Sequence, residues 1–129
     1  MTIQPSEINI NSLDQEFLQN AIEQVEVNMD DFEFSVEKLA SSLHMSRMQL
    51  YRKMKALTNK NPNSFIRTIR LKRAAQLLEA NRYTVAEVTY MVGFQDLKYF
   101  RERFKKEFGL SPSEYSSKAI KSKKVDESI

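Results

Sequence analysis

The sequence contains no cysteine, and it has only one histidine, two glycines and three prolines among 129 residues. The absence of cysteine excludes disulfide bonds and thiolate metal sites, and it is typical of proteins in a reducing compartment. The scarcity of chain-breaking residues favours helices joined by short turns. No segment alternates apolar and polar residues for long enough to predict a sheet, and no apolar run reaches the ~18 residues of a membrane-spanning helix. We therefore expect an all-α protein.

Acidic and basic residues are unevenly distributed along the chain. Residues 1–34 hold eight acidic residues and no Lys or Arg, whereas residues 35–129 hold all 20 Lys and Arg and nine acidic residues. A basic body of this kind favours a polyanionic partner. Solvated helix faces would explain the same charges equally well, so composition alone does not decide between the two.

Apolar periodicity and capping residues predict seven helices, over residues 13–29, 36–43, 47–57, 62–80, 85–92, 97–108 and 112–115. The buried face of the first is expected to consist of Leu18, Ile22, Val25 and Met29,. The fourth is apolar around much of its circumference, which indicates packing on two sides. We expect residues 1–12 to form a flexible leader or the end of a linker, and residues 118–129 to form a disordered basic tail.

Residues 35–65 and 84–115 share one pattern, which indicates an internal repeat. Before the turn the matching positions are 49 residues apart, as for Leu39 and Val88, and after it they are 50 apart, as for Leu50 and Phe100. In both copies a helix, a turn, a second helix and a helix that begins with proline follow in that order. We interpret the repeat as two copies of a helix-turn-helix unit.

The second helix of each copy combines an apolar stripe with a basic outer surface. In the first copy its charged residues are Arg47, Arg52, Lys53 and Lys55, and in the second the basic residues Lys98, Arg101, Arg103, Lys105 and Lys106 accompany Glu102. A recognition helix in the major groove of DNA needs such a surface, because arginine can donate two hydrogen bonds to guanine. One such helix could simply face water, but two in the same repeat favour DNA binding. The helix over residues 62–80, about 27 Å long, is comparable with the ~34 Å between major-groove entries.

Several segments resemble the AraC/XylS family of transcription regulators. In the second copy they are residues 85–92, Gly93-Phe94, Tyr99-Phe100, Phe104-Lys105-Lys106 and residues 108–115 (FGLSPSEY). Residues 69–78 (IRLKRAAQLL) resemble the linker helix of that family, and the likeness as a whole covers residues 15–117. Residues 17–29 and 34–36 are similar to the C-terminal output domain of hybrid two-component regulators.

The resemblance implies a fold of two helix-turn-helix lobes joined by a central linker helix, with about seven helices. Residues 13–117 would form the AraC-type DNA-binding domain, with lobes at 13–60 and 84–117 and the linker helix at 62–80. The implied function is that of a sequence-specific transcription regulator domain, which inserts two recognition helices into successive major-groove segments of promoter DNA.

Carried over position by position, the family pattern implies ten DNA-contacting residues. The expected base readers are Met48, Tyr51, Arg52, Leu97, Lys98, Arg101 and Glu102, with Arg47 and Lys55 nearer the backbone and Lys105 on phosphate. Glu102 departs from the basic residue that the family often has there. It could accept a hydrogen bond from cytosine N4, or it could pair with Lys98 or Lys106 four residues away. Asn59 stands where the second copy has Gly109, at a helix end where the left-handed conformation costs asparagine more than glycine.

The same residues also allow protein interaction, RNA binding and catalysis to be considered as functions. In a protein-interaction module, the acidic first helix would contact an upstream signalling domain or RNA polymerase. RNA binding would require exposed aromatic platforms, whereas the aromatic residues here follow apolar stripes. His44 has no second histidine or cysteine to join it in a metal site or triad, so we expect no enzyme activity, metal or cofactor,.

The expected partners are double-stranded promoter DNA, RNA polymerase and an upstream receiver or sensor domain. We expect the isolated domain to be a monomer in the cytoplasm. Relatives of the hybrid type are anchored in the inner membrane, and the resemblance extends that expectation to the full-length parent.

Overall fold

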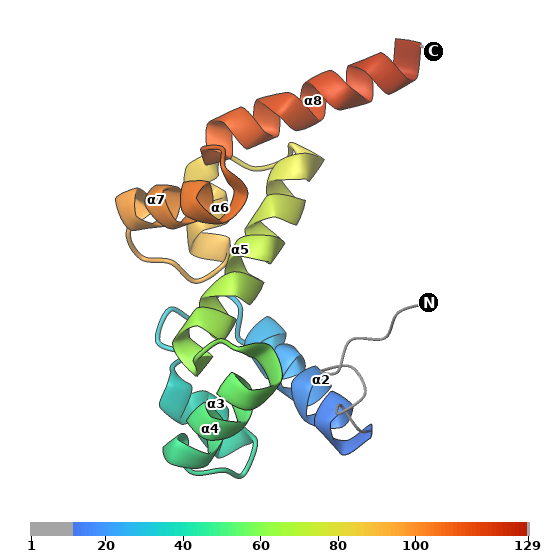
Figure 1. Ribbon diagram of the computed structural model, residues 1–129. Coiled ribbons are helices and arrows are strands. Elements are labelled where there is room, and N and C mark those ends of the chain that lie inside the picture. Colours follow the sequence, from blue (N-terminus) through green and yellow to red (C-terminus); the bar gives the residue numbers. More distant parts are fainter. Residues whose placement is uncertain (1–11, 129) are drawn as a thin grey trace. The chain divides into compact units, whose positions relative to one another are not determined.

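The computed structural model describes residues 12–128, which form seven α-helices and no strand (Figure 1). The helices are α2 (Ser12–Val27), α3 (Val36–Ser42), α4 (Arg47–Thr58), α5 (Pro62–Ala80), α6 (Val85–Met91), α7 (Leu97–Phe108) and α8 (Pro112–Ser128). The predicted all-α fold with two helix-turn-helix lobes is confirmed, and α5 and α7 have the predicted limits. No helix within the described residues is both long and apolar enough to cross a membrane.

The helices form two units. Unit 1 contains residues 12–28 and 34–66, and unit 2 contains residues 29–33 and 67–128. Helix α5 contributes its first turn to unit 1 and the rest of its length to unit 2. The connector at residues 29–33 belongs to unit 2. The expected limits of the first lobe, residues 13–60, stay a prediction. The expected leader at residues 1–11 lies outside the described residues.

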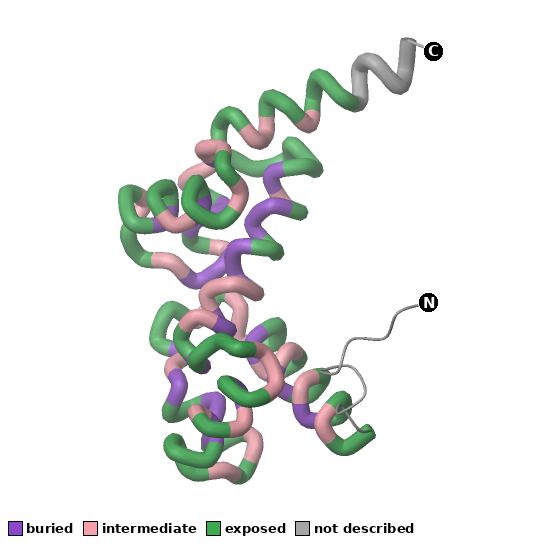
Figure 2. The backbone as a smooth tube through the Cα atoms, viewed as in Figure 1, coloured by how far each residue is buried: buried purple, intermediate pink, exposed green. Residues whose placement is uncertain are grey.

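The core of unit 1 is built from one face of each of its first three helices (Figure 2). Its buried side chains include Val36, Leu39 and Ala40 from α3, and Leu50 and Met54 from α4. In α2 the expected burial is confirmed for Val25, whereas Leu18, Ile22 and Met29 are only half-buried and the other fully buried side chains are Phe17 and Ala21. The apolar periodicity allows both registers, and burying the large Phe17 ring removes more apolar surface from water than burying Leu18 would.

The core of unit 2 lies between α5, α6 and α7. Its buried residues are Leu71, Ala74, Ala75, Leu78, Val88, Val92, Phe100 and Phe104. Aromatic rings continue this core toward α8. The centre of the Phe104 ring lies 5.4 Å from that of Tyr115, in an edge-to-face arrangement, and 4.6 Å from that of Phe108. Because Phe100 and Phe104 are fully buried, the rotation of α7 about its own axis is fixed.

Helix α8 is longer than the sequence predicted. The expected end at residue 115 is wrong, and the segment expected to be a disordered tail is helical through Ser128. Residues 116–128 contain neither glycine nor proline, so nothing in them stops a helix,. The start of α8 is also anchored to the end of α5. Tyr115 donates a hydrogen bond of 2.5 Å to Glu79, and the Ser116 hydroxyl lies 2.7 Å from Asn81 Oδ1.

Candidate nucleic-acid interface

The start of α4 is set by local hydrogen bonds in unit 1. His44, in the turn after α3, adopts a left-handed φ of 57°, and the Met45 amide donates to the Ala40 carbonyl at 2.9 Å. Ser46 then forms a capping box, because its hydroxyl accepts from the Gln49 amide at 3.1 Å while its own amide donates to Gln49 Oε1 at 2.9 Å. The box satisfies two amides that a helix start otherwise leaves without partners. It therefore makes Arg47 the first residue of α4.

Burial of the inner stripe determines which side chains of α4 face outward. Leu50 and Met54 are fully buried, so the opposite side of the helix is presented to solvent. Among the residues of α4 that were expected to contact DNA, Arg47, Met48, Arg52 and Lys55 are exposed and Tyr51 is half-buried. Met48 is 69% exposed, which is unusual for a methionine in a helix of a folded unit,. The five residues expected to contact DNA from this helix thus lie outside the core. At the end of the helix, Asn59 adopts the left-handed φ of 60° that its match to Gly109 implied.

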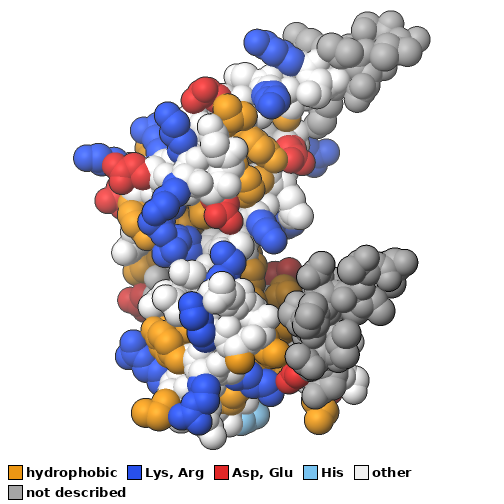
Figure 3. Space-filling model, in the orientation of Figure 1, with side chains coloured by type: hydrophobic (Ala, Val, Ile, Leu, Met, Phe, Trp, Pro, Cys, Tyr) orange, Lys and Arg blue, Asp and Glu red, His pale blue; other side chains and the backbone are white. Residues whose placement is uncertain are grey.

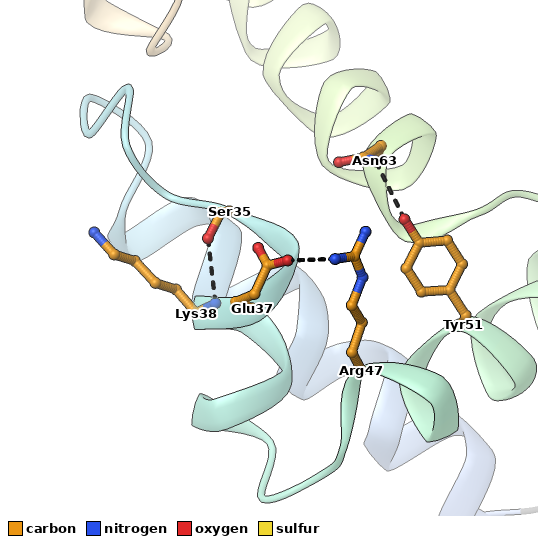
Figure 4. Close-up of polar contacts among 6 residues, drawn as sticks. All are labelled: Ser35, Glu37, Lys38, Arg47, Tyr51 and Asn63. Carbon is orange, nitrogen blue, oxygen red and sulfur yellow. Dashed lines mark hydrogen bonds and ion pairs between the residues drawn. The ribbon is translucent and has the colours of Figure 1, made fainter.

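A chain of polar contacts crosses from α3 to α5 over the start of α4 (Figure 4). Arg47 donates to Glu37 Oε1 at 2.7 Å, and its guanidinium lies 5.4 Å from the centre of the Tyr51 ring. The Tyr51 hydroxyl in turn accepts from Asn63 Nδ2 at 3.2 Å. Backbone hydrogen bonding, followed by the nearby Arg47 charge, lowers the pKa of Glu37 below its ordinary value. Neither Glu37 nor Asn63 was predicted from the sequence, although both flank the predicted helix.

Lys53 differs from the other basic residues of α4, because it points toward α2. Its Nζ atom lies 3.9 Å from Asp14 Oδ1 and 4.7 Å from the centre of the Phe17 ring. A cation over an aromatic face is attracted by the ring's negative face. Lys53 therefore joins α4 to α2 on the side of the helix away from its exposed basic residues.

Unit 2 repeats the same construction with different side chains. Thr84 and Glu87 form a capping box at the start of α6, with hydrogen bonds of 3.0 and 3.1 Å. Gly93 follows α6 with a φ of 85°, and Asp96 caps α7 by accepting from the Tyr99 amide at 3.2 Å. Helix α7 ends at Phe108 and is capped by Gly109, whose left-handed φ of 78° accounts for the glycine at this position,.

The outer surface of α7 is strongly charged. Lys98, Arg101, Glu102 and Lys105 are exposed, and Leu97 is half-buried at the first position of the helix. Figure 3 shows Lys and Arg side chains gathered over the part of unit 2 that contains α7, with acidic side chains among them. Within the described residues no ion pair joins Glu102 to Lys98 or Lys106. The pairing that would have explained this acid is thus not formed, and its role in reading DNA stays a prediction.

Arg70 is a structural residue of unit 2 whose role was not predicted from the sequence. It is only 6% exposed, and its guanidinium donates to three backbone carbonyls: Val92 at 3.2 Å, Gly93 at 2.6 Å and Asp31 at 2.8 Å. Burial lowers the pKa of Arg70, and the Asp31 charge opposes that effect. The side chain therefore ties the turn between α6 and α7 to the connector at residues 29–33.

A sequence signal for Arg70 was present. It stands four residues from Ile66 and four from Ala74, within a stripe of buried positions on α5. A charged residue at a position where the periodicity predicts burial has to be hydrogen-bonded. That rule would have predicted a buried guanidinium, although not the carbonyls that receive it.

The two units and their connecting helix define a helix-turn-helix protein, and comparisons with known proteins agree. A family described as a helix-turn-helix domain matches residues 39–118. A transcriptional regulator from Chromobacterium violaceum, described as AraC-type, has a similar structure, with a TM-score of 0.77 at 26% identity over 84% of this chain and 96% of that one. The DNA-binding domain of AdpA, solved in complex with a target DNA, gives a TM-score of 0.68 at 32% identity, covering 81% and 89% of the two chains.

Curated relatives extend the comparison to longer proteins. Histidine kinase P4 of Formosa agariphila is 47% identical over 116 residues, which cover 90% of this chain and 8% of that protein. The regulator MtrA of Neisseria gonorrhoeae is 34% identical over 89 residues, or 69% of this chain and 30% of that protein. The chain thus spans less than a third of either relative. It belongs to the AraC-type family of helix-turn-helix DNA-binding domains of transcription regulators, as its resemblance to AraC/XylS proteins implied.

Proposed function

We propose that this domain binds promoter DNA sequence-specifically by inserting α4 and α7 into the major groove. The observation that carries the proposal is the doubled construction, in which a buried stripe on each second helix leaves its basic outer surface exposed. A recognition helix reads base edges with that surface while its inner side packs on the domain. The target DNA in the AdpA complex supports duplex DNA as the ligand class.

The roles of the individual residues follow from their chemistry. Arg52 is exposed on α4 and can donate two hydrogen bonds to guanine, whereas Met48 can contact a thymine methyl group,. Lys55 lies one turn further along the helix and serves as a phosphate contact. On α7 Lys98, Arg101 and Glu102 are assigned to bases, Leu97 to an apolar contact and Lys105 to phosphate. This is a binding role, and we assign the domain no catalytic step.

Replacing Arg52 by Ala tests the assignment most directly. If Arg52 reads a base, affinity for a duplex selected from a random pool falls by roughly 1–3 kcal/mol, and the base preference relaxes at one position. Lys55→Ala should instead weaken binding to all sequences. It should also reduce the slope of log affinity against log salt concentration by about one. Arg82→Ala is the matched control, since it removes the same charge from an exposed turn outside both helices. Fluorescence anisotropy against selected and random duplexes measures both effects. Equal affinity of the wild type for the two duplexes would contradict sequence-specific reading.

The outer face of α2 supports a second candidate function, contact with a protein partner. Phe17, Ala21 and Val25 bury one side of this helix in unit 1, but Leu13 and Val27 are 71% and 77% exposed. The exposed acids Glu16, Glu23 and Glu26 lie on the same helix. We infer that this surface faces an upstream signalling domain or RNA polymerase. Replacing the three glutamates by Gln should preserve DNA affinity and lower transcription activation in cells, and an unchanged activation would remove the surface from consideration.

The likeness to a histidine kinase supports a further proposal about the parent protein. The 47% identity to a small part of that kinase suggests that the domain is the output segment of a hybrid two-component regulator. Such a parent would be anchored in the inner membrane with this domain in the cytoplasm, where its DNA is. Phosphorylation-dependent occupancy of one promoter in cells would test the assignment, and constitutive occupancy would contradict it.

A further inference from the structure

The ion pair between Glu37 and Arg47 lies on the surface that the proposed function assigns to DNA. Arg47 is the first residue of α4, and Glu37 lies in the first turn of α3. Their side chains are 59% and 60% exposed, with a separation of 2.7 Å. Arg47 also covers the ring of Tyr51, an expected base reader. An acidic side chain is thus held beside two of the residues that would meet DNA (Figure 4).

The second copy of the repeat has no such pair. The position that matches Glu37 is Ala86, 49 residues on, and the position that matches Arg47 is Leu97, 50 residues on. The pair is therefore not needed to build a helix-turn-helix unit of this kind. Because the pair occurs in unit 1 alone, we look for its role in the binding of DNA by α4.

Glu37 is suited to oppose a phosphate group. Backbone hydrogen bonding at the start of α3 and the charge of Arg47 keep its pKa low, so the side chain is ionised at neutral pH. A phosphate that approached Arg47 would also approach a carboxylate 2.7 Å from that guanidinium. The phosphate would either displace Glu37 from Arg47 or be repelled by its carboxylate. In both cases the contact between the phosphate and Arg47 is weakened.

We propose that Glu37 is a specificity-determining residue, which holds Arg47 and thereby suppresses binding to DNA of the wrong sequence. This inference rests on the proposed function. Affinity for random duplex comes almost wholly from phosphate contacts, and a cation on a loosely docked protein can reach any nearby phosphate. At the correct site base contacts fix the position of α4, so freeing one further cation adds less. Glu37 therefore lowers affinity for random DNA more than affinity for the selected site.

The test compares Glu37→Gln with the wild type on a random-sequence 30-base-pair duplex and on a duplex selected from a random pool. Removing the carboxylate should tighten binding to the random duplex by roughly two- to fivefold at low salt. The plot of log affinity against log salt for that duplex should become steeper by about one unit, because one more phosphate is neutralised. Affinity for the selected duplex should change less than twofold, so the ratio of the two affinities falls.

Two controls separate this role from a general effect of charge. Glu23→Gln removes the same charge from an exposed position on α2 and should leave both affinities within the error of the wild type. In an Arg47→Ala background, Glu37→Gln should no longer tighten binding, because the freed cation is absent. Circular dichroism melting of each variant confirms that it is folded.

Several results would overturn the inference while leaving the proposed function in place. They are an unchanged affinity of Glu37→Gln for random duplex, an equal gain on both duplexes, or a full gain that persists in the Arg47→Ala background. A wild-type domain that bound neither duplex would overturn the proposed function together with the inference.

Discussion

Gly93 lies in the turn between α6 and α7, where both its conformation and its surroundings exclude a side chain. Its φ is 85°, in the left-handed region. A Cβ atom added there would lie 1.7 Å from Arg70 Nη1 and 2.5 Å from the Met29 carbonyl oxygen. Gly109 has a similar φ of 78°, but a Cβ added there would meet nothing within 4 Å. The two glycines are therefore a matched pair for the substitutions Gly93→Ala and Gly109→Ala.

The pair separates the cost of backbone strain from the cost of the contacts that only a side chain at position 93 would make, with Arg70 and with the Met29 carbonyl oxygen. A non-glycine residue in the left-handed conformation costs about 1–2 kcal/mol, and both variants bear it. Only at position 93 must Arg70 also move, and it then loses hydrogen bonds to Val92 and Gly93. A hydrogen bond from a charged donor contributes about 1.5–3 kcal/mol. With that contribution for each of the two hydrogen bonds, the free energy of unfolding should fall by about 4–8 kcal/mol in Gly93→Ala and by about 1–2 kcal/mol in Gly109→Ala.

Urea unfolding followed by far-ultraviolet circular dichroism measures this difference, and amide hydrogen exchange in α6 and α7 assigns it to unit 2. An Arg70→Met background gives a second measurement. With the guanidinium gone, the part of the cost of Gly93→Ala that comes from displacing Arg70 should disappear, so the two changes should not be additive. The clash of the added Cβ with the Met29 carbonyl oxygen remains in this background, and it keeps the cost of Gly93→Ala above that of Gly109→Ala. Equal destabilisation by the two alanines in the wild-type background would refute the reasoning, because it would mean that Arg70 leaves its carbonyls at no cost.

Single contacts at Ser46 and Tyr115 contribute measurably to stability. Ser46→Ala removes the hydroxyl that caps α4, and the free energy of unfolding should fall by about 0.5–2 kcal/mol in urea titrations, with Ser113→Ala, at an exposed site in α8, as the control. The hydrogen bond to Glu79 raises the pKa of Tyr115 to about 12, above the ordinary 10.0. Because this folded-state pKa exceeds the unfolded one, the protonated Tyr115 hydroxyl contributes fully to the free energy of unfolding below pH 10.0. That contribution is lost as pH rises toward 12,. Tyr115→Phe should therefore lose less stability than the wild type across that window, and parallel stability curves would contradict the assignment.

Much of the fold could be predicted because its determinants are local. Capping residues, the apolar periodicity and the glycine after α7 lie within a few residues of the structure that they specify. The limits of α5 and α7 were therefore predicted correctly, and so were the starts of α4 and α6, which Ser46 and Thr84 cap. The long C-terminal helix was missed because its charged and serine-rich composition is also typical of disorder. The anchor of Ser116 on Leu78, 38 residues away, could not be seen in the sequence.

In the candidate site, too, the exposed positions could be predicted from the sequence, but the contacts of their side chains could not. The exposed positions of α4 and α7 follow from the buried stripes of Leu50 and Met54 and of Phe100 and Phe104, so the surface could be anticipated from periodicity. The partners of its side chains could not. Lys53 was counted with the outer basic residues but lies against α2.

The sequence by itself determined seven helices, two copies of one helix-turn-helix unit and membership of the AraC-type family, because repeats, caps and motifs are properties of neighbouring residues. Only the tertiary structure decided that Arg70 is buried beneath the turn of unit 2, where it reaches Asp31 across 39 residues of chain. It alone decided that Glu37 holds Arg47 across the turn of unit 1. Both outcomes depend on where packing places a long, flexible, charged side chain, and periodicity gives the direction of such a side chain but not its partner.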